Sequence, residues 1–191
     1  MSKPTSVILL CEDYRQASVV LAYLRRCGIR RGVRPIPWPD GEGSGEQWVR
    51  RQYPIQVDAY ISQAARIDTR LVVVIDADTG PVSRRIHQLD ESLRMAEERR
   101  LRSLVVTEEK IARLIPRRNI ETWILALNAV AVNETEDYKQ SRPPARWNEL
   151  VSPASDQLYE WTRANASLPD TLIDSLKMAI REIVRVIPGT R

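Results

Sequence analysis

Residues 70–78 read RLVVVIDAD, and this stretch decides which fold the rest of the chain can adopt. Its apolar part is rich in β-branched residues on both faces, which predicts a strand over 70–75 that is buried inside a parallel sheet. The strand ends in two acids, Asp76 and Asp78. Because alternate side chains of an extended segment lie on the same side, we expect these two carboxylates to point one way and Ala77 the other.

A second apolar run, SVILLC over 6–11, also ends in acid, at Glu12 and Asp13. The functional crevice of an open α/β sheet lies at the carboxyl ends of its strands, so Glu12, Asp76 and Asp78 converge if these two strands are neighbours. Carboxylates placed together repel one another unless a cation or protons neutralise them. Oxygen ligands, and a single histidine in the whole chain, favour Mg²⁺ or Mn²⁺ over zinc.

The remaining segments alternate between strand and helix. Helical patterns follow the first strand as far as Gly28, run from Glu46 through Ile61, and begin again after Pro81 and after the expected cap Asn119. Shorter strands are expected at 33–38, where three prolines favour a sheet edge, and at 111–115. This order predicts an α/β fold with a doubly wound, mainly parallel four-stranded sheet and helices on both faces.

The chain has 191 residues, of which 43% are hydrophobic, enough for one sizeable core. We expect residues 1–132 to form the α/β domain, and residues 133–191 to supply a linker and a C-terminal helical annex packed on it. The last helix carries a stripe at alternating spacings of three and four, which fits core packing or, alternatively, a homodimer contact. Its members are Ile173, Leu176, Ile180, Ile183 and Ile187.

Arginine dominates the charge of the chain. Lys and Arg number 29 against 25 Asp and Glu, and the net charge is +4. Guanidinium forks match phosphate oxygens, so nucleic acid is the expected partner, with a merely solvated basic surface as the alternative. The arginine pairs are Arg25-Arg26, Arg30-Arg31, Arg50-Arg51, Arg84-Arg85, Arg99-Arg100 and Arg117-Arg118.

Other classes of protein are disfavoured by what the sequence lacks. No apolar run approaches the length that spans a bilayer, and the N-terminal segment turns acidic too soon for a secretory signal. The cysteines, Cys11 and Cys27, have no CxxC spacing and fit reduced core thiols. We therefore expect a cytoplasmic protein with no membrane partner.

The two acid-ended segments, VILLCEDYRQASVVLAYL and VVVIDADTG, with an α/β order between them, resemble the Toprim domain over roughly residues 6–130. The segment LIPRRNIETWILAL also resembles stand-alone Toprim-like proteins of prokaryotes, which are related to OLD-type nucleases. The resemblance implies a Toprim-like fold and a nuclease that acts on DNA or RNA. It implies Glu12, Asp76 and Asp78 as metal ligands, with Glu12 also as acid or base. Because several such proteins accompany ATPases in phage defence, it further implies a partner ATPase and an antiviral role.

The sequence departs from the best-known Toprim pattern directly after the first acid. Glycine is usual there in topoisomerases and primases, whereas this chain has Asp13, which reduces the access of a phosphate to the backbone. Asp13 would supply either a helix N-cap, which we favour, or a fourth carboxylate. The glycine loop over 41–46 would offer backbone N–H groups to a phosphate or would be an ordinary flexible loop.

Four further residues are candidates for catalysis at the same rim. Arg117 and Arg118 follow the last expected strand and would clamp a scissile phosphate. Glu121 would bind a second metal or, alternatively, interact favourably with the helix dipole. Lys139 would neutralise the charge of the phosphorane, as lysines of OLD-type nucleases do.

Two other functions remain open at this point. A HAD-like phosphatase also ends a strand in DxD, but that family places a hydroxyl two residues after the second Asp, where this chain has Gly80. A non-catalytic regulatory or scaffolding subunit of an ATPase complex would keep the fold and dock through its arginines or its last helix. Cleavage of nucleic acid with Mn²⁺ but not with EDTA would distinguish an enzyme from such a subunit.

Overall fold

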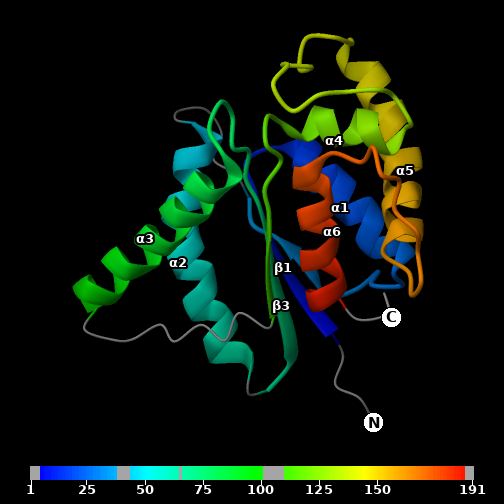
Figure 1. Cartoon of the computed structure of the whole chain (residues 1–191). Helices are drawn as coiled ribbons and strands as arrows, with labels where there is room; N and C mark the ends of the chain where they lie inside the picture. The colour runs from blue at the N-terminus through cyan, green and yellow to red at the C-terminus, as the bar shows by residue number, and fades with distance from the viewer. Residues whose placement is uncertain (1–4, 38–43, 65, 101–109, 188–191) are drawn as a thin grey trace.

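The structure is a computed structural model, and it describes residues 5–37, 44–64, 66–100 and 110–187. Its strands form one four-stranded sheet in the order β2-β1-β3-β4, and every neighbouring pair is parallel (Figure 1). The central pair runs in register from Thr5 opposite Asp68 to Cys11 opposite Val74. The strands are β1 (Thr5–Cys11), β2 (Val33–Pro35), β3 (Asp68–Val74) and β4 (Ile111–Leu114).

Helices cover both faces of the sheet, as the sequence predicts (Figure 1). One layer holds α2 (Gly45–Ala64) and α3 (Val82–Arg100), and the other holds α1 (Tyr14–Arg26), α4 (Ile120–Leu127), α5 (Pro144–Trp161) and α6 (Asp174–Val186). Along β1, Val7 and Leu9 pack toward the α1 layer, whereas Ile8 and Leu10 pack toward the α2 layer. This alternation explains why the strand is apolar throughout.

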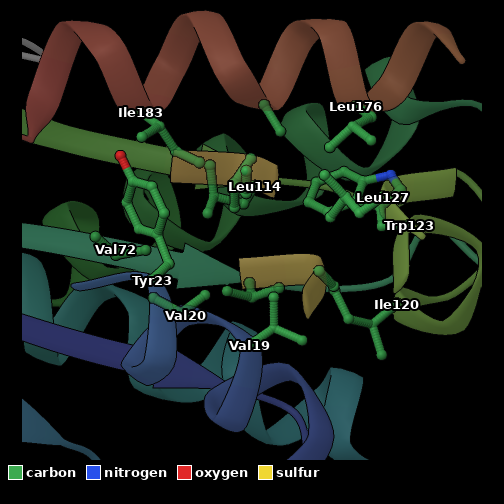
Figure 2. Close-up of a cluster of buried hydrophobic side chains, with 14 of the residues drawn as sticks. Val19, Val20, Tyr23, Val72, Leu114, Ile120, Trp123, Leu127, Leu176 and Ile183 are labelled. Carbon is green, nitrogen blue, oxygen red and sulfur yellow. The ribbon is translucent and has the colours of Figure 1, made fainter. Parts of the chain in front are cut away.

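The larger core lies on the α1 side and includes the C-terminal helices (Figure 2). Two of its buried aromatic residues have polar atoms, and each finds a partner. The hydroxyl of Tyr23 lies 3.0 Å from Thr162 Oγ1 at the end of α5, and Trp123 Nε1 donates to Ser175 Oγ on α6 at 2.7 Å. These bonds satisfy groups that would be costly to bury alone, and they tie α5 and α6 to the helices beside the sheet.

The apolar stripe of α6 faces this core. Leu176, Ile180, Ile183 and Ile187 are buried, Ile173 is partly buried, and the helix packs against β4. The core-packing alternative accounts for these side chains. A homodimer through α6 stays a prediction, and it would have to use other side chains of the helix.

Strand β2 lies at the sheet edge, as its prolines predict, but it is shorter than the expected 33–38. After Pro35 the chain makes one more backbone bond to the sheet, from Ile36 N to Leu9 O at 2.8 Å. Trp38 and positions 41–43 of the glycine loop lie outside the described residues. In the part of the chain that is described, no helix is long and apolar enough to cross a membrane.

Candidate functional site

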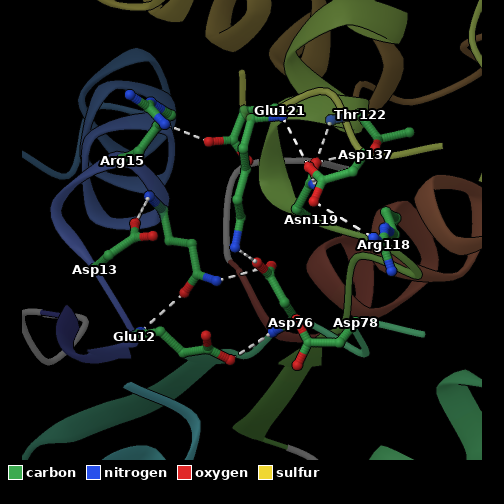
Figure 3. A network of polar contacts seen from close by, with 12 residues as sticks. Glu12, Asp13, Arg15, Asp76, Asp78, Arg118, Asn119, Glu121, Thr122 and Asp137 are labelled. Carbon is green, nitrogen blue, oxygen red and sulfur yellow. Dashed lines mark hydrogen bonds and ion pairs between the residues drawn. The ribbon is translucent and has the colours of Figure 1, made fainter. Parts of the chain in front are cut away.

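The adjacency of β1 and β3 brings Glu12 and Asp76 together at the carboxyl ends of the two strands (Figure 3). Glu12 Oε1 accepts a hydrogen bond from the backbone N–H of Asp76 at 2.7 Å. The side chain of Asp76 is only 1% exposed, and its Oδ1 accepts from Gln16 Nε2 at 2.9 Å. The Oε1 of Gln16 accepts in turn from the backbone N–H of Glu12 at 2.9 Å. The buried amide of Gln16 therefore links the two acidic residues.

Asp13 positions Gln16 by capping α1. Its Oδ1 accepts from the backbone N–H of Gln16 at 2.9 Å, and its own backbone is extended, as an N-cap requires. The helix-cap interpretation of Asp13 is therefore confirmed. An acid directly after Glu12 serves the geometry of the site by starting the helix that carries Gln16.

The surroundings of Glu12 and Asp76 disfavour the charged form of both carboxyl groups. Burial raises the pKa of Glu12 from 4.5 to about 7; the N–H of Asp76 opposes this shift, and the charge of Asp78 adds to it. Burial and then the nearby Glu12 raise the pKa of Asp76, while Lys139 opposes the shift. The Oδ2 atom of Asp76 is buried and has no hydrogen-bond partner among the described residues. A proton or a cation bound to Asp76 Oδ2 would reduce the repulsion between the two carboxyl groups and would give this buried atom a partner.

The loop between α4 and α5 places Lys139 beside Asp76. The ammonium group lies 3.6 Å from Asp76 Oδ2. Burial alone would lower the pKa of Lys139, but the charges of Asp76, Glu121 and Asp78 raise it. Lys139 is therefore a cation next to the oxygen that has no hydrogen bond, as a role at the predicted site requires.

Asp137 anchors this loop to the end of the sheet. Its Oδ1 accepts from Asn119 Nδ2 at 2.9 Å, and its Oδ2 lies 3.4 Å from Arg118. Asn119 also caps α4, accepting from the N–H of Thr122 at 3.2 Å, as the sequence predicts. One asparagine thus holds both the helix that follows β4 and the loop that carries Lys139.

Asp78 is not buried with Glu12 and Asp76, although its charge acts on Glu12. Strand β3 ends at Val74, and Asp78 has a left-handed backbone with φ of +54°, so the extended geometry that would align it with Asp76 does not continue this far. Its side chain is 55% exposed, and its Oδ2 accepts from Arg85 at 3.2 Å. The assignment of Asp78 as a metal ligand stays a prediction.

Arg85 was not anticipated as a site residue, yet it is buried beside the end of β3. Its Nε donates to the backbone oxygen of Asp76 at 2.8 Å, and its guanidinium group also bonds Gln88 at 2.8 Å and forms an ion pair with Glu46 at the start of α2. The sequence places Arg85 in one of the arginine pairs, and a further signal is that it lies four residues before the core residue Leu89, on the buried face of α3.

Glu121 is buried near the site, where its charge raises the pKa of both Asp76 and Lys139. It is 1% exposed, forms an ion pair with Arg15, and leaves its Oε2 without a hydrogen-bond partner in the described structure. The other rim candidates pair with acids of the loop between α4 and α5. Arg117 is 49% exposed and lies 3.9 Å from Glu134, and Arg118 lies against Asp137.

Gly45 brings the start of α2 against Glu12. A Cβ atom at this position would lie 2.8 Å from Glu12 O and 2.9 Å from Glu12 Cβ, closer than real contacts allow. Only glycine permits this approach, which places the end of the glycine loop directly beside the acid.

The donor set fits a hard cation in part. All of its candidate ligands are oxygens, Asp76 Oδ2 is buried without a hydrogen bond, and the raised pKa values of Glu12 and Asp76 are what a cation would reverse. Asp78 would join them only by leaving Arg85. Among the described residues, no group of three or more His, Cys, Asp or Glu side chains is arranged to hold a metal ion.

Comparison of the chain with protein-family models, with curated proteins and with solved structures finds no match. The resemblance to the Toprim domain therefore rests on the acid-ended strands and the segment after β4, and no family is assigned to the chain.

Proposed function

We propose that this chain is a metal-dependent nuclease that hydrolyses phosphodiester bonds in DNA or RNA and has a Toprim-like fold. One observation carries the proposal. At the carboxyl ends of the two central parallel strands, Asp76 is buried against Glu12, and its Oδ2 accepts no hydrogen bond from a described residue but lies 3.6 Å from the ammonium group of Lys139. Such an arrangement is costly for a purely structural site, and perturbed carboxyl groups of this kind cluster at functional sites.

In this proposal Glu12 and Asp76 would hold Mg²⁺ or Mn²⁺, with Asp78 as a further ligand; such an ion would supply a Lewis acid for the phosphate and a lower pKa for the attacking water. Glu12 would accept the proton of that water, since a bound cation would favour the charged form of this buried carboxyl group. Gln16 keeps the Asp76 carboxylate in one orientation through its bond to Oδ1.

Cations around this pair would stabilise the negative charge that develops on the phosphate. Lys139 is the nearest, since it already lies beside Asp76. Arg117 and Arg118 pair with acids of the loop that carries Lys139 and would reach the substrate by exchanging these carboxylates for phosphate oxygens. Glu121 would hold a second metal in place of its ion pair with Arg15.

The test is a cleavage assay on plasmid DNA, single-stranded DNA and RNA with Mg²⁺, Mn²⁺ or EDTA. We expect cleavage that requires the metal and that Asp76→Asn abolishes while the protein stays folded. Asp170→Asn is the matched control, because Asp170 is an exposed loop residue and its loss removes the same charge. Cleavage that persists in EDTA or in Asp76→Asn would refute the proposed site, and no cleavage of any substrate would refute the activity.

A second candidate is a non-catalytic regulatory or scaffolding subunit of an ATPase complex. One observation favours it: only two carboxylates, Glu12 and Asp76, are buried together at the strand ends, and Asp78 is exposed and pairs with Arg85. Such a subunit would show no change in melting temperature with Mn²⁺, whereas a metal-binding nuclease would melt higher. A partner ATPase and an antiviral role rest on the resemblance alone and stay predictions for either candidate.

A further inference from the structure

The segment between Asp13 and Asp40 has an unusual charge pattern. It contains six arginines and no acidic residue, and five of the six fall within positions 25–34. Part of this segment forms α1, whose first residue follows the Asp13 cap beside the candidate site and whose last residue is Arg26. The arginine-rich positions therefore begin at the end of α1 that is far from the acids.

The far end of α1 carries a hollow lined by arginines. Arg25, Arg26 and Arg30 surround a depression of about 600 Å³ together with Ala22 and Ser152 of α5. All three arginines are exposed, and Arg26 bonds Asp156 at 3.0 Å. Arg25 and Arg30 form no ion pair with any described residue, so their charges are open to an anionic partner.

A stripe without negative charge connects this hollow to the acidic site. Tyr14, Ser18, Ala22 and Arg25 lie at spacings of four, four and three, so they share one face of α1. Tyr14 at the site end is 65% exposed, which is unusual for a large aromatic side chain. The 13 residues of α1 span about 20 Å.

We propose that this face of α1 is a track for a single strand of nucleic acid, with a base stacked on Tyr14 and phosphates bound by Arg25 and Arg30. The inference rests on the proposed function and deepens it by giving the path of the substrate away from the acids. An exposed aromatic ring selects an unpaired base, and guanidinium groups select phosphate. The track length corresponds to about six nucleotides at the 3.4 Å rise of a stacked strand.

The test measures binding in EDTA, so it does not depend on cleavage. Fluorescein-labelled oligothymidylates of twelve and three nucleotides serve as probes in anisotropy titrations over a range of salt concentrations. The longer probe spans the track and the shorter one does not. The wild-type protein should bind the longer probe much more tightly, and Arg25→Ala/Arg30→Ala should lose most of that difference. The slope of log affinity against log salt should fall by about 1.4 in this variant, because two phosphate contacts are lost.

Two variants separate the track from general charge and from general damage. Arg66→Ala/Arg181→Ala removes the same charge from exposed positions, one after α2 and one on α6, and should leave affinity and salt slope near the wild-type values. Tyr14→Ala should weaken binding of the longer probe at least about fivefold without changing the salt slope, since stacking releases no counterions. Thermal melting of each variant checks that it is folded.

The proposal is overturned if the two double variants lose affinity equally, if affinity does not depend on probe length, or if an acidic peptide competes as well as the nucleic acid. Specific binding without cleavage in Mn²⁺ would retain the track and refute the nuclease. Cleavage without the length-dependent binding would retain the nuclease and refute the track.

Discussion

Replacing Glu12 by glutamine tests whether the negative charge of this residue, at the end of β1, destabilises the folded protein. Glutamine keeps the shape of the side chain and an oxygen that accepts the N–H of Asp76, but it cannot ionise. The comparison between the two proteins therefore isolates the charge of one carboxyl group.

The sign and size of the effect follow from the pKa of Glu12, which burial raises from 4.5 to about 7. Between these two pH values the folded protein holds a proton that the unfolded chain has released. The unfolded state then binds fewer protons, so the free energy of unfolding falls as pH rises through this window. A shift of this size is worth about 3 kcal/mol once the pH exceeds 7. In a chain of 191 residues this corresponds to roughly 10 °C in melting temperature.

Urea unfolding in EDTA at pH 5 and pH 8 measures the difference. We expect the two proteins to be similar at pH 5 and Glu12→Gln to be more stable at pH 8. The wild-type protein should recover stability at pH 8 when Mn²⁺ is added, because the ion binds the folded state, and the variant should recover less. A residual slope is expected in both proteins, since Asp76 also titrates with a raised pKa. Equal pH dependence in the two proteins would refute the strained carboxyl pair.

Three further substitutions test neighbouring features of the site. Gly45→Ala should destabilise the protein by about 1 to 3 kcal/mol in urea unfolding, because its Cβ would overlap the backbone of Glu12, and wild-type stability would contradict that close approach. Lys139→Met should lower stability at pH 8 by about 1 kcal/mol by removing the cation beside Asp76, whereas Lys139→Arg should not; equal losses would show that the charge is unimportant. Asp78→Asn should shift the melting temperature in EDTA by less than about 3 °C, because the side chain is exposed and asparagine tolerates the left-handed backbone; a larger shift would show a tighter structural role.

The sequence predicts the site best where a strand stops. Apolar runs buried on both faces end abruptly, so Glu12 and Asp76 could be placed at the carboxyl ends of their strands without knowledge of the fold. The caps Asp13 and Asn119 were predictable for a similar reason, because an N-cap depends on the few residues that follow it. Each of these inferences needs only short-range information.

The contacts that the sequence did not indicate join residues that are far apart in the chain. Gln16 meets Asp76 across 60 positions, and nothing near either residue encodes that contact. Lys139 was named through the resemblance, but its approach to Asp76 depends on a loop that Asp137 anchors to the end of β4. Such contacts follow from the order of strands in the sheet and from the path of the loops, which local patterns leave open.

The partners of Arg85 decide whether Asp78 can leave it to join Glu12 and Asp76. A buried guanidinium group is costly without a partner, so an arginine that depended on Asp78 alone would resist losing it. Arg85 has other partners, because Glu46 forms an ion pair with it and Gln88 accepts from it at 2.8 Å. The exposed Asp78 carboxylate can therefore leave at a cost near that of a surface ion pair, below about 1 kcal/mol. The structure therefore allows Asp78 to become a third ligand at small cost if a cation binds between Glu12 and Asp76, and the Mn²⁺ melting comparison distinguishes that case from a subunit in which Asp78 stays with Arg85.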